Sequence, residues 1–233
     1  MRRLIAITLL AALLAGCGGS GHKSPPLTAG VTFTARVTNP WYPLLPGSTW
    51  VYRGVKDGEP SREVMKVTHR TKTIAGAPCV VVSDLLYLSG HLEERTEDYY
   101  TQDSQGRVWY FGEKTAELDK QGHMKNTSGS WLAGVNGAKP GIFMFTNPRP
   151  RQSARQEYYK GEAEDHFRVL RLDASVKVPF ITTGHALQTK EWTPLEPGVI
   201  DHKFYVRGIG TALERTAKGP LERNELVSFM RGS

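Results

Sequence analysis

Beyond residue 30, the hydrophobic positions of this chain repeat with the period of β-strands, and helical periodicity is almost absent. Short runs rich in β-branched and aromatic residues alternate with polar residues, and Gly, Pro, Asp and Asn interrupt them. The pattern predicts strands at Thr49 to Val55, Arg62 to Arg70, Ala77 to Ser89, Leu92 to Thr101, Val108 to Phe111, Ile142 to Thr146, Arg155 to Tyr159, Ala163 to Leu172, Val176 to Thr182, His185 to Trp192, Ile200 to Val206, Gly210 to Arg215 and Glu222 to Phe229. The expected fold class is all-β, an antiparallel meander that curls into an open or closed barrel-like sheet.

The first thirty residues break that pattern. Met1-Arg2-Arg3 is followed by the apolar run from Leu4 to Leu14, and small residues then lead to Cys17. A positive start, a short apolar helix and a small-residue cleavage site are typical of a signal peptide, which we expect at 1–16. The apolar run is shorter than the roughly 20 residues that a transmembrane helix needs.

The tetrapeptide Leu14-Ala15-Gly16-Cys17 resembles the lipobox of bacterial lipoproteins. The resemblance implies cleavage before Cys17, a diacylglycerol on its sulfur, and a membrane partner reached through acyl chains. Because residue 18 is Gly and not Asp, the expected location is the outer membrane in a cell with two membranes, and otherwise the outer face of the cytoplasmic membrane. We expect residues 17–30 to be the lipidated cysteine with a flexible tether, and 31–233 to be a single β-rich domain.

Charge and cysteine content narrow the picture further. The formal net charge is +7, and removal of Arg2 and Arg3 with the signal peptide leaves +5. This charge is spread along the chain without a basic block, so we expect no nucleic-acid partner. If Cys17 carries lipid, Cys79 has no partner for a disulfide, and its apolar surroundings predict a buried, inert thiol.

The stretch "NPWYPLLPGSTWVYRG", residues 39–54, concentrates aromatic residues and proline just after the tether. Its prolines keep the chain extended, and the alternation after Gly47 predicts that Trp50 is buried on a first strand. Large rings beside a rigid bend suit a plug at the end of the sheet, and they also suit a platform for a ligand. Both interpretations of Trp41 and Tyr42 are open at this level.

Four segments together resemble a family of exported bacterial proteins, many of them lipoproteins, for which no activity is established. The segments are "NPWYPLLPGSTWVY", "QDSQGRVWYFGE", "GSWLAGVNGAKPGI" and "QEYYKGEAED". The resemblance extends from Asn39 to Phe229 and implies one β-rich domain. It implies no catalytic residue.

The sequence offers little that predicts catalysis. It holds no zinc, P-loop, nucleophile-elbow or dinucleotide motif, and its seven His residues are scattered, so we expect no cofactor and no metal site. The glycine-rich segment Gly122 to Gly141 surrounds Trp131 and precedes Phe143 and Phe145. Such a long loop predicts either a lid, with these three rings touching an apolar ligand, or a segment packed on the sheet.

The segment around Lys160-Gly161 predicts that two glutamate side chains lie close together. If Lys160-Gly161 were a two-residue hairpin turn, Glu157 would face Glu164 across the ribbon. Like charges at that spacing destabilise a pair, so something must neutralise them. Arg155 with solvent, a bound cation, or one raised pKa in an acid/base pair would each do so.

Three functions remain open. The first is an envelope lipoprotein whose curled sheet binds an apolar or amphiphilic ligand, with Trp131, Phe143, Phe145, Glu157 and Glu164 as candidate contacts. The second is an interaction or structural module that meets another envelope protein through an exposed apolar patch. The third is a carboxylate-dependent hydrolase with acids converging in a cleft. A binding or interaction role is favoured over an enzyme, and the identity of any ligand is beyond the sequence.

Overall fold

The computed structural model describes residues 30–233. The predicted signal peptide (1–16), Cys17 and the rest of the predicted tether up to residue 29 lie outside the described residues. Val31–Ser233 forms one compact unit. Within the described part of the chain, no helix is long and apolar enough to cross a membrane.

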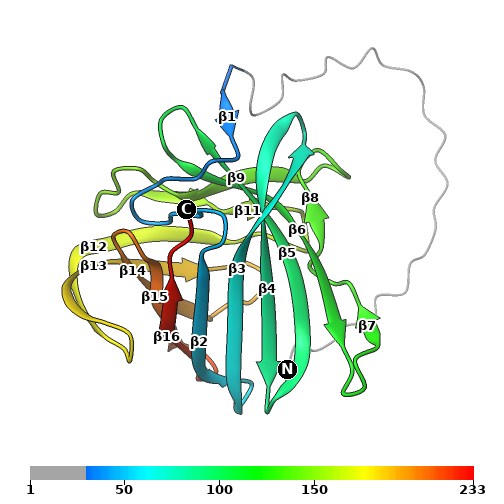
Figure 1. Ribbon diagram of the computed structural model, residues 1–233, viewed down its shortest axis with the longest axis vertical. Coiled ribbons are helices and arrows are strands. Elements are labelled where there is room, and N and C mark those ends of the chain that lie inside the picture. Colours follow the sequence, from blue (N-terminus) through cyan, green and yellow to red (C-terminus); the bar gives the residue numbers. More distant parts are fainter. Residues whose placement is uncertain (1–29) are drawn as a thin grey trace. The chain divides into compact units, whose positions relative to one another are not determined.

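Between residues 30 and 233, sixteen strands make up one sheet. In chain order they are β1 (Phe33–Thr34), β2 (Thr49–Lys56), β3 (Glu59–Ile74), β4 (Ala77–Leu88), β5 (His91–Asp103), β6 (Val108–Leu118), β7 (Met124–Asn126), β8 (Trp131–Leu132), β9 (Lys139–Met144), β10 (Ser153–Arg155), β11 (Glu157–Tyr158), β12 (His166–Lys177), β13 (Thr182–Trp192), β14 (Ile200–Val206), β15 (Gly210–Lys218) and β16 (Arg223–Met230). The predicted all-β antiparallel class is confirmed, and the sheet curls until it nearly closes into a barrel (Figure 1).

The barrel is a meander in which chain neighbours are also sheet neighbours. Strands β2 to β6 follow one another, β9 pairs with β6, and β12 to β16 follow one another on the other side. The last strand, β16, then pairs with β2, from Met230 beside Thr49 to Arg223 beside Val55. Pairing the end of the chain with its beginning removes two exposed sheet edges at once.

The remaining gap is bridged by one short stretch, residues 153–158. Its first half, β10, pairs with β12, whereas its second half, β11, pairs with β9. Gln156 joins the two halves and donates its backbone N–H to Asp165 O at 2.7 Å. Gly141 of β9 lies so close that a Cβ there would meet the Arg155 carbonyl oxygen at 2.3 Å, so this seam requires glycine.

Three successive hairpins fix the register of β2 to β5. Their turns are Asp57-Gly58, Ala75-Gly76 and Ser89-Gly90, and all six residues have positive φ. Two-residue turns of this conformation match the right-handed twist of the flanking strands.

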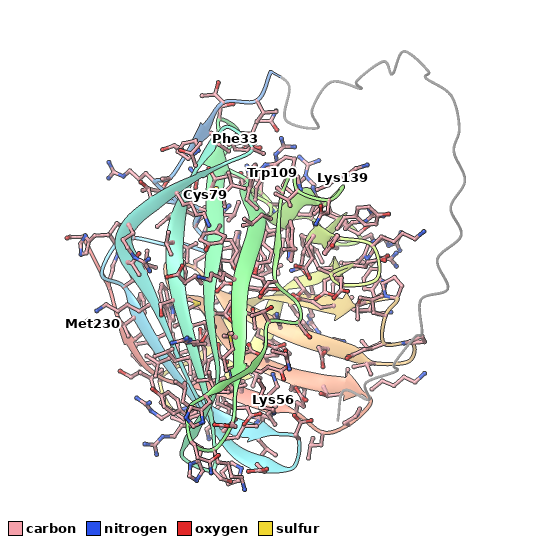
Figure 2. The ribbon with its side chains drawn as sticks, turned by 90° about the vertical axis from the view of Figure 1, so that its right-hand side faces the viewer. Phe33, Lys56, Cys79, Trp109, Lys139 and Met230 are labelled. Carbon is pink, nitrogen blue, oxygen red and sulfur yellow. The ribbon has the colours of Figure 1, made fainter. Side chains whose placement is uncertain are left out.

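One end of the barrel is packed with aromatic rings. Residues 38–48 lie across this end, and Asn39 donates its side-chain amide to the carbonyls of Gly106 and Phe145. Trp41, Tyr42 and Trp50 are buried, so the predicted burial of Trp50 is confirmed, and the packing of Trp41 and Tyr42 agrees with the plug interpretation. Figure 2 places Phe33 and Trp109 at the upper end of the view and Lys56 at the opposite end.

Some predicted strand bounds are wrong. The predicted strand from Val176 to Thr182 does not exist, because β12 runs on to Lys177 through register shifts that absorb the irregular pattern after Val169. Strands β1, β7 and β8 were not predicted, since two or three residues carry too little periodicity. The predicted burial of Cys79 is confirmed, and burial raises the pKa of its thiol to about 12.

Candidate functional site

The interior holds a polar cavity of about 220 Å³. Its lining includes Val55 and Lys56, which come just before the β2–β3 turn, and Ser61, which follows it. The other lining residues are Glu63, Asp84, Leu86, Glu94, Thr96, Asp98, Glu113, Glu214, Glu222, Arg223 and Asn224. Carboxyl groups therefore dominate the wall of this cavity.

Strand alternation places these acids on the inner face. Along β5, Glu94, Thr96 and Asp98 share one side of the sheet, and Tyr100 continues the same row into the aromatic end. Glu63 of β3 and Asp84 of β4 occupy the equivalent rows of their strands. The outer face of β5 is charged as well, because Arg95 and Glu97 point the other way.

Asp98 and Glu113 are direct cross-strand partners on β5 and β6. The Tyr110 hydroxyl donates to Asp98 Oδ1 at 2.6 Å, and the Thr115 hydroxyl donates to Glu113 Oε2 at 2.9 Å. Directly opposed residues have Cβ atoms about 4.5–5.5 Å apart, so the two carboxyl groups share one small volume.

Glu63 and Asp84 form a second pair, placed diagonally across β3 and β4. Glu63 is opposite Leu86, and Asp84 is opposite Met65. The Asn224 side-chain amide donates to Glu63 Oε2. Burial and the neighbouring charge of Glu63 together favour the protonated form of Asp84.

Two buried oxygens beside this pair lack a donor. Within residues 30–233, Asp84 Oδ1 and Asn224 Oδ1 are buried side-chain atoms without a hydrogen-bond partner. A buried acceptor that loses water and gains no donor is destabilising by about 1–3 kcal/mol. Both residues belong to the cavity wall, so a ligand in the cavity could donate N–H or O–H groups to these two oxygens.

A third group of charges is already neutralised. Lys203 Nζ lies 3.1 Å from Glu191 Oε2 and 3.6 Å from Glu214 Oε1. The Tyr205 and Thr189 hydroxyls both donate to Glu191 Oε1. Burial alone would lower the Lys203 pKa, but Glu191 and Glu214 outweigh it and raise the pKa well above its ordinary value. Lys203 thus compensates part of the acidity at one side of the interior.

The other acids hold protons more tightly than usual. Burial raises the pKa of Asp98 to about 7, although the hydrogen bond from Tyr110 opposes the shift. Burial, followed by the charge of Glu63, raises the pKa of Asp84 well above its ordinary value. Burial, followed by the charge of Asp98, does the same to the pKa of Glu113. Carboxyl groups in this state can donate as well as accept hydrogen bonds.

Glu157 and Trp131, both predicted ligand contacts, lie together beside the cavity, where Trp131 is the cross-strand partner of Glu113. Trp131 of β8 is buried and donates its indole N–H to Glu157 Oε2 at 2.9 Å. Burial raises the pKa of Glu157 to about 8. The segment Gly122 to Gly141 that carries Trp131 contains β7 and β8, which pair with β6.

Phe143 and Phe145 lie at the aromatic end. The Phe143 ring centroid is 4.6 Å from that of Tyr42, and the Phe145 centroid is 5.2 Å from that of Phe167. Their role as ligand contacts stays a prediction. Neither ring lines the acidic cavity.

The predicted pairing of Glu157 with Glu164 is wrong. Tyr159 bridges to Ala163, so the loop holds three residues, and Glu157 pairs with Pro140 of β9. Glu164 instead accepts the backbone N–H of Gly161 at 2.8 Å. Arg155 pairs with His166 of β12, on the other side of the irregularity at Gln156.

The acids of the cavity were not predicted, although the sequence holds one signal for them. In "HLEERTEDYY" charged residues occupy both faces of a strand in the middle of the sheet. A charged residue therefore has to face inward there, whichever face is buried. The register that brings Glu63, Asp84 and Glu113 beside Asp98 depends on turns and bulges that the sequence leaves open.

No three of the His, Cys, Asp and Glu side chains in the described part of the chain are arranged to hold a metal ion. The cavity acids are instead distributed over neighbouring strands. The described geometry suits a ligand that contacts several carboxyl groups along a wall.

Comparison with family models finds no match. Comparison with curated proteins also finds none. Among solved structures, the chain is similar to a protein from Bacteroides fragilis described as exported, with a YmcC-like fold, at 14% identity and a TM-score of 0.46. That likeness covers 82% of this chain and 99% of the other. A protein from Parabacteroides distasonis described as a lipoprotein gives 11% identity and a TM-score of 0.44, over 81% of this chain and 97% of the other. At these values, the function has to be argued from the residues of this chain.

Proposed function

We propose that this protein is an exported lipoprotein of the cell envelope whose barrel binds a small, positively charged ligand in the acidic cavity. The observation that carries the proposal is the cavity wall, where carboxyl groups surround two buried oxygens that lack donors. A ligand with positive charge and N–H groups would satisfy both features.

The charge balance of the wall supports a cation. Among the described lining residues, seven carry carboxyl groups and two, Lys56 and Arg223, are cationic. Arg223 is already engaged, because its guanidinium bonds Glu225. The sequence predicts an apolar or amphiphilic ligand, but a purely apolar ligand would strip water from these carboxyl groups without replacing its hydrogen bonds.

Binding can be tested by calorimetry with three probes: putrescine, spermidine and choline. Putrescine and spermidine carry N–H donors, whereas choline has charge without them. We expect the two amines to bind and Asp84→Asn to weaken them about tenfold, the equivalent of about 1.4 kcal/mol. Glu93→Gln is the matched control, because Glu93 neighbours Glu94 on β5 but points outward to Lys125. If neither amine binds, the proposal fails.

Lipid anchoring through Cys17 is a separate part of the proposal, and it rests on the lipobox-like tetrapeptide. Cys17→Ala should release the protein from the membrane fraction of its host, since acyl chains supply the anchor. A Cys17→Ala protein that still requires detergent for extraction would contradict the anchor. An apolar ligand near Trp131 and a partner protein in the envelope stay predictions.

A hydrolase is the second candidate, and the direct opposition of Asp98 and Glu113 favours it. Two carboxyl groups at cross-strand spacing can divide acid and nucleophile roles when their pKa values differ. Turnover of aryl glycosides that is abolished by both Asp98→Asn and Glu113→Gln would support this alternative. Binding of amines without turnover of any glycoside would exclude it.

A further inference from the structure

The two carboxyl pairs of the cavity are placed so that each can hold a proton between its members. Asp98 and Glu113 are directly opposed, and Glu63 and Asp84 are diagonal neighbours on the same face of the sheet. Two carboxylates this close repel each other strongly unless a proton or another cation lies between them.

Few fixed cations are available to neutralise these pairs. The titratable or charged groups that face them come from every neighbouring strand. They are Tyr42 before β2, Tyr52 and Lys56 of β2, Glu63 of β3, Asp84 of β4, Glu94, Asp98 and Tyr100 of β5, Tyr110 and Glu113 of β6, Glu157 of β11, Lys203 of β14, Glu214 of β15, Arg223 of β16, and Glu222 just before β16. Lys203 is shared by Glu191 and Glu214, Arg223 bonds Glu225, and Lys56 acts on Glu222, so protons are the remaining source of neutrality for the two pairs.

The positions of the pairs also indicate the shape of the ligand. One pair spans β3 and β4, and the other spans β5 and β6. Their midpoints are two strand spacings apart, which is about 10 Å along the sheet and less across the curved interior. A metal ion needs its oxygens within about 2.6 Å of a single point, whereas an elongated diamine can place one ammonium at each pair.

On the basis of the proposed cation site, we infer that the cavity exchanges protons for its ligand, and that the ligand is an elongated organic amine. Each ammonium enters as one O–H bond of a carboxyl pair breaks. The released proton passes to solvent, and the two carboxylates that remain share the ammonium. Ammonium N–H groups then donate to Asp84 Oδ1 and Asn224 Oδ1, the two oxygens without a partner.

The exchange keeps the charge of the buried wall nearly constant. Without ligand, the protons limit repulsion among the acids, and raised pKa values at Asp84, Asp98 and Glu113 agree with that state near neutral pH. With ligand, the ammonium groups take over this role. The affinity should therefore rise with pH, by up to about tenfold per pH unit for each proton released.

The proton count can be measured directly. Putrescine and spermidine are titrated into the protein at pH 7 in phosphate and in Tris, whose ionisation enthalpies differ widely. We expect the observed enthalpy to depend on the buffer, with a slope of about one to two protons released per ligand. Affinities at pH 6 and pH 8 provide an independent readout on the unmodified protein.

Variants of the two carboxyl pairs show which pair releases each proton when the amine binds. Asp84→Asn and Glu113→Gln each remove one protonation site while keeping shape and a carbonyl acceptor, so each should lower the proton release by about one. Glu93→Gln should leave the count unchanged. The melting curve of each variant shows that the barrel is folded.

Two failures have different meanings. If the amines bind with the same enthalpy in both buffers and the same affinity at pH 6 and pH 8, the exchange is wrong and the proposed cation site stands. If neither amine binds at any pH, the proposed function fails and the exchange fails with it.

Discussion

The two ends of the barrel interior are built from the same strands and have opposite character. Toward one end, the inner face carries Tyr100 of β5 and Tyr110 of β6, whose rings stack on each other, and Trp50 of β2, whose ring packs on Phe229. Toward the other end, β5 and β6 carry Asp98 and Glu113 around a cavity. One end is filled and the other is hollow.

This difference indicates which end stabilises the fold. Burial of aromatic rings is strongly favourable, whereas burial of carboxyl groups with few partners is unfavourable. The aromatic end must therefore contribute the favourable free energy that offsets the unfavourable burial of acids at the other end. Acids that destabilise a fold and nevertheless line a cavity are a candidate functional feature, in the way that strained or polar interiors often are.

Trp50 provides the most direct test of whether the aromatic end stabilises the fold. Its side chain is 1% exposed, its ring packs on Phe229, and its indole N–H donates to Ile209 O at 2.7 Å. We expect Trp50→Ala to lower the free energy of unfolding by about 3–5 kcal/mol. Denaturant melts at pH 7 measure it. A loss below about 1 kcal/mol would mean that the aromatic end is not the stabilising one.

The acidic end predicts an unusual dependence of stability on pH. Because burial raises the pKa values of Asp98 and Glu214 to about 7, the folded state binds more protons than the unfolded state between pH 4.5 and 7. Their stabilising contribution is complete below the ordinary carboxyl pKa and is lost as pH rises through 7, by up to about 1.4 kcal/mol per pH unit for each group.

Melting temperatures between pH 5 and pH 8 test this dependence. We expect the barrel to melt at a higher temperature at pH 5 than at pH 8. The variant Asp98→Asn should flatten the curve, because the amide does not titrate. A melting temperature that rises steadily from pH 5 to pH 8 would contradict the protonated state of the cavity.

Much of the fold was accessible from the sequence because its strands are long and regular. The bounds of β14 were predicted without error, and those of β2 and β4 to within one residue, since alternation and turn residues agree there. The closing seam was not predictable. Residues 153–158 divide their pairing between two strands, and this depends on the close approach of Gly141, a tertiary contact.

The candidate site was less accessible than the fold. The sequence predicts acids that meet across one hairpin, whereas the cavity acids come from strands as far apart in the chain as β3, with Glu63, and β15, with Glu214, which the order of strands around the barrel brings together. Lipidation at Cys17 lies outside the described residues and stays a prediction. The charge on both faces of β5 was the available signal, and it indicates an inward acid without giving its partner.

The hydrogen bond from Trp131 to Glu157 joins a buried aromatic ring to a buried acid, and its contribution to stability can be measured. The indole N–H is the donor to Glu157 Oε2, and Glu157 is 8% exposed. Trp131→Phe keeps most of the ring and removes the donor, so we expect a loss of about 1–3 kcal/mol, larger at pH 9 than at pH 6. The pH difference follows from the Glu157 pKa of about 8, because the ionised form needs the donor more. Equal losses at both pH values would contradict this assignment.

The smallest expected change in stability is that of Glu164→Gln, and it distinguishes Glu164 from the buried Glu157. Glu164 is partly exposed and accepts one backbone N–H within its own loop, so Glu164→Gln should change stability by less than about 0.5 kcal/mol. Glu157→Gln removes a buried acid that is costly to ionise, so it should raise stability at pH 9 relative to pH 6. Since the two side chains belong to different pairings, the double variant should equal the sum of the single variants within about 0.5 kcal/mol. Melts of the three variants at both pH values measure the coupling energy between the two sites. A coupling energy above about 1 kcal/mol would mean that Glu157 and Glu164 face each other, and it would contradict the pairing of β11 with β9.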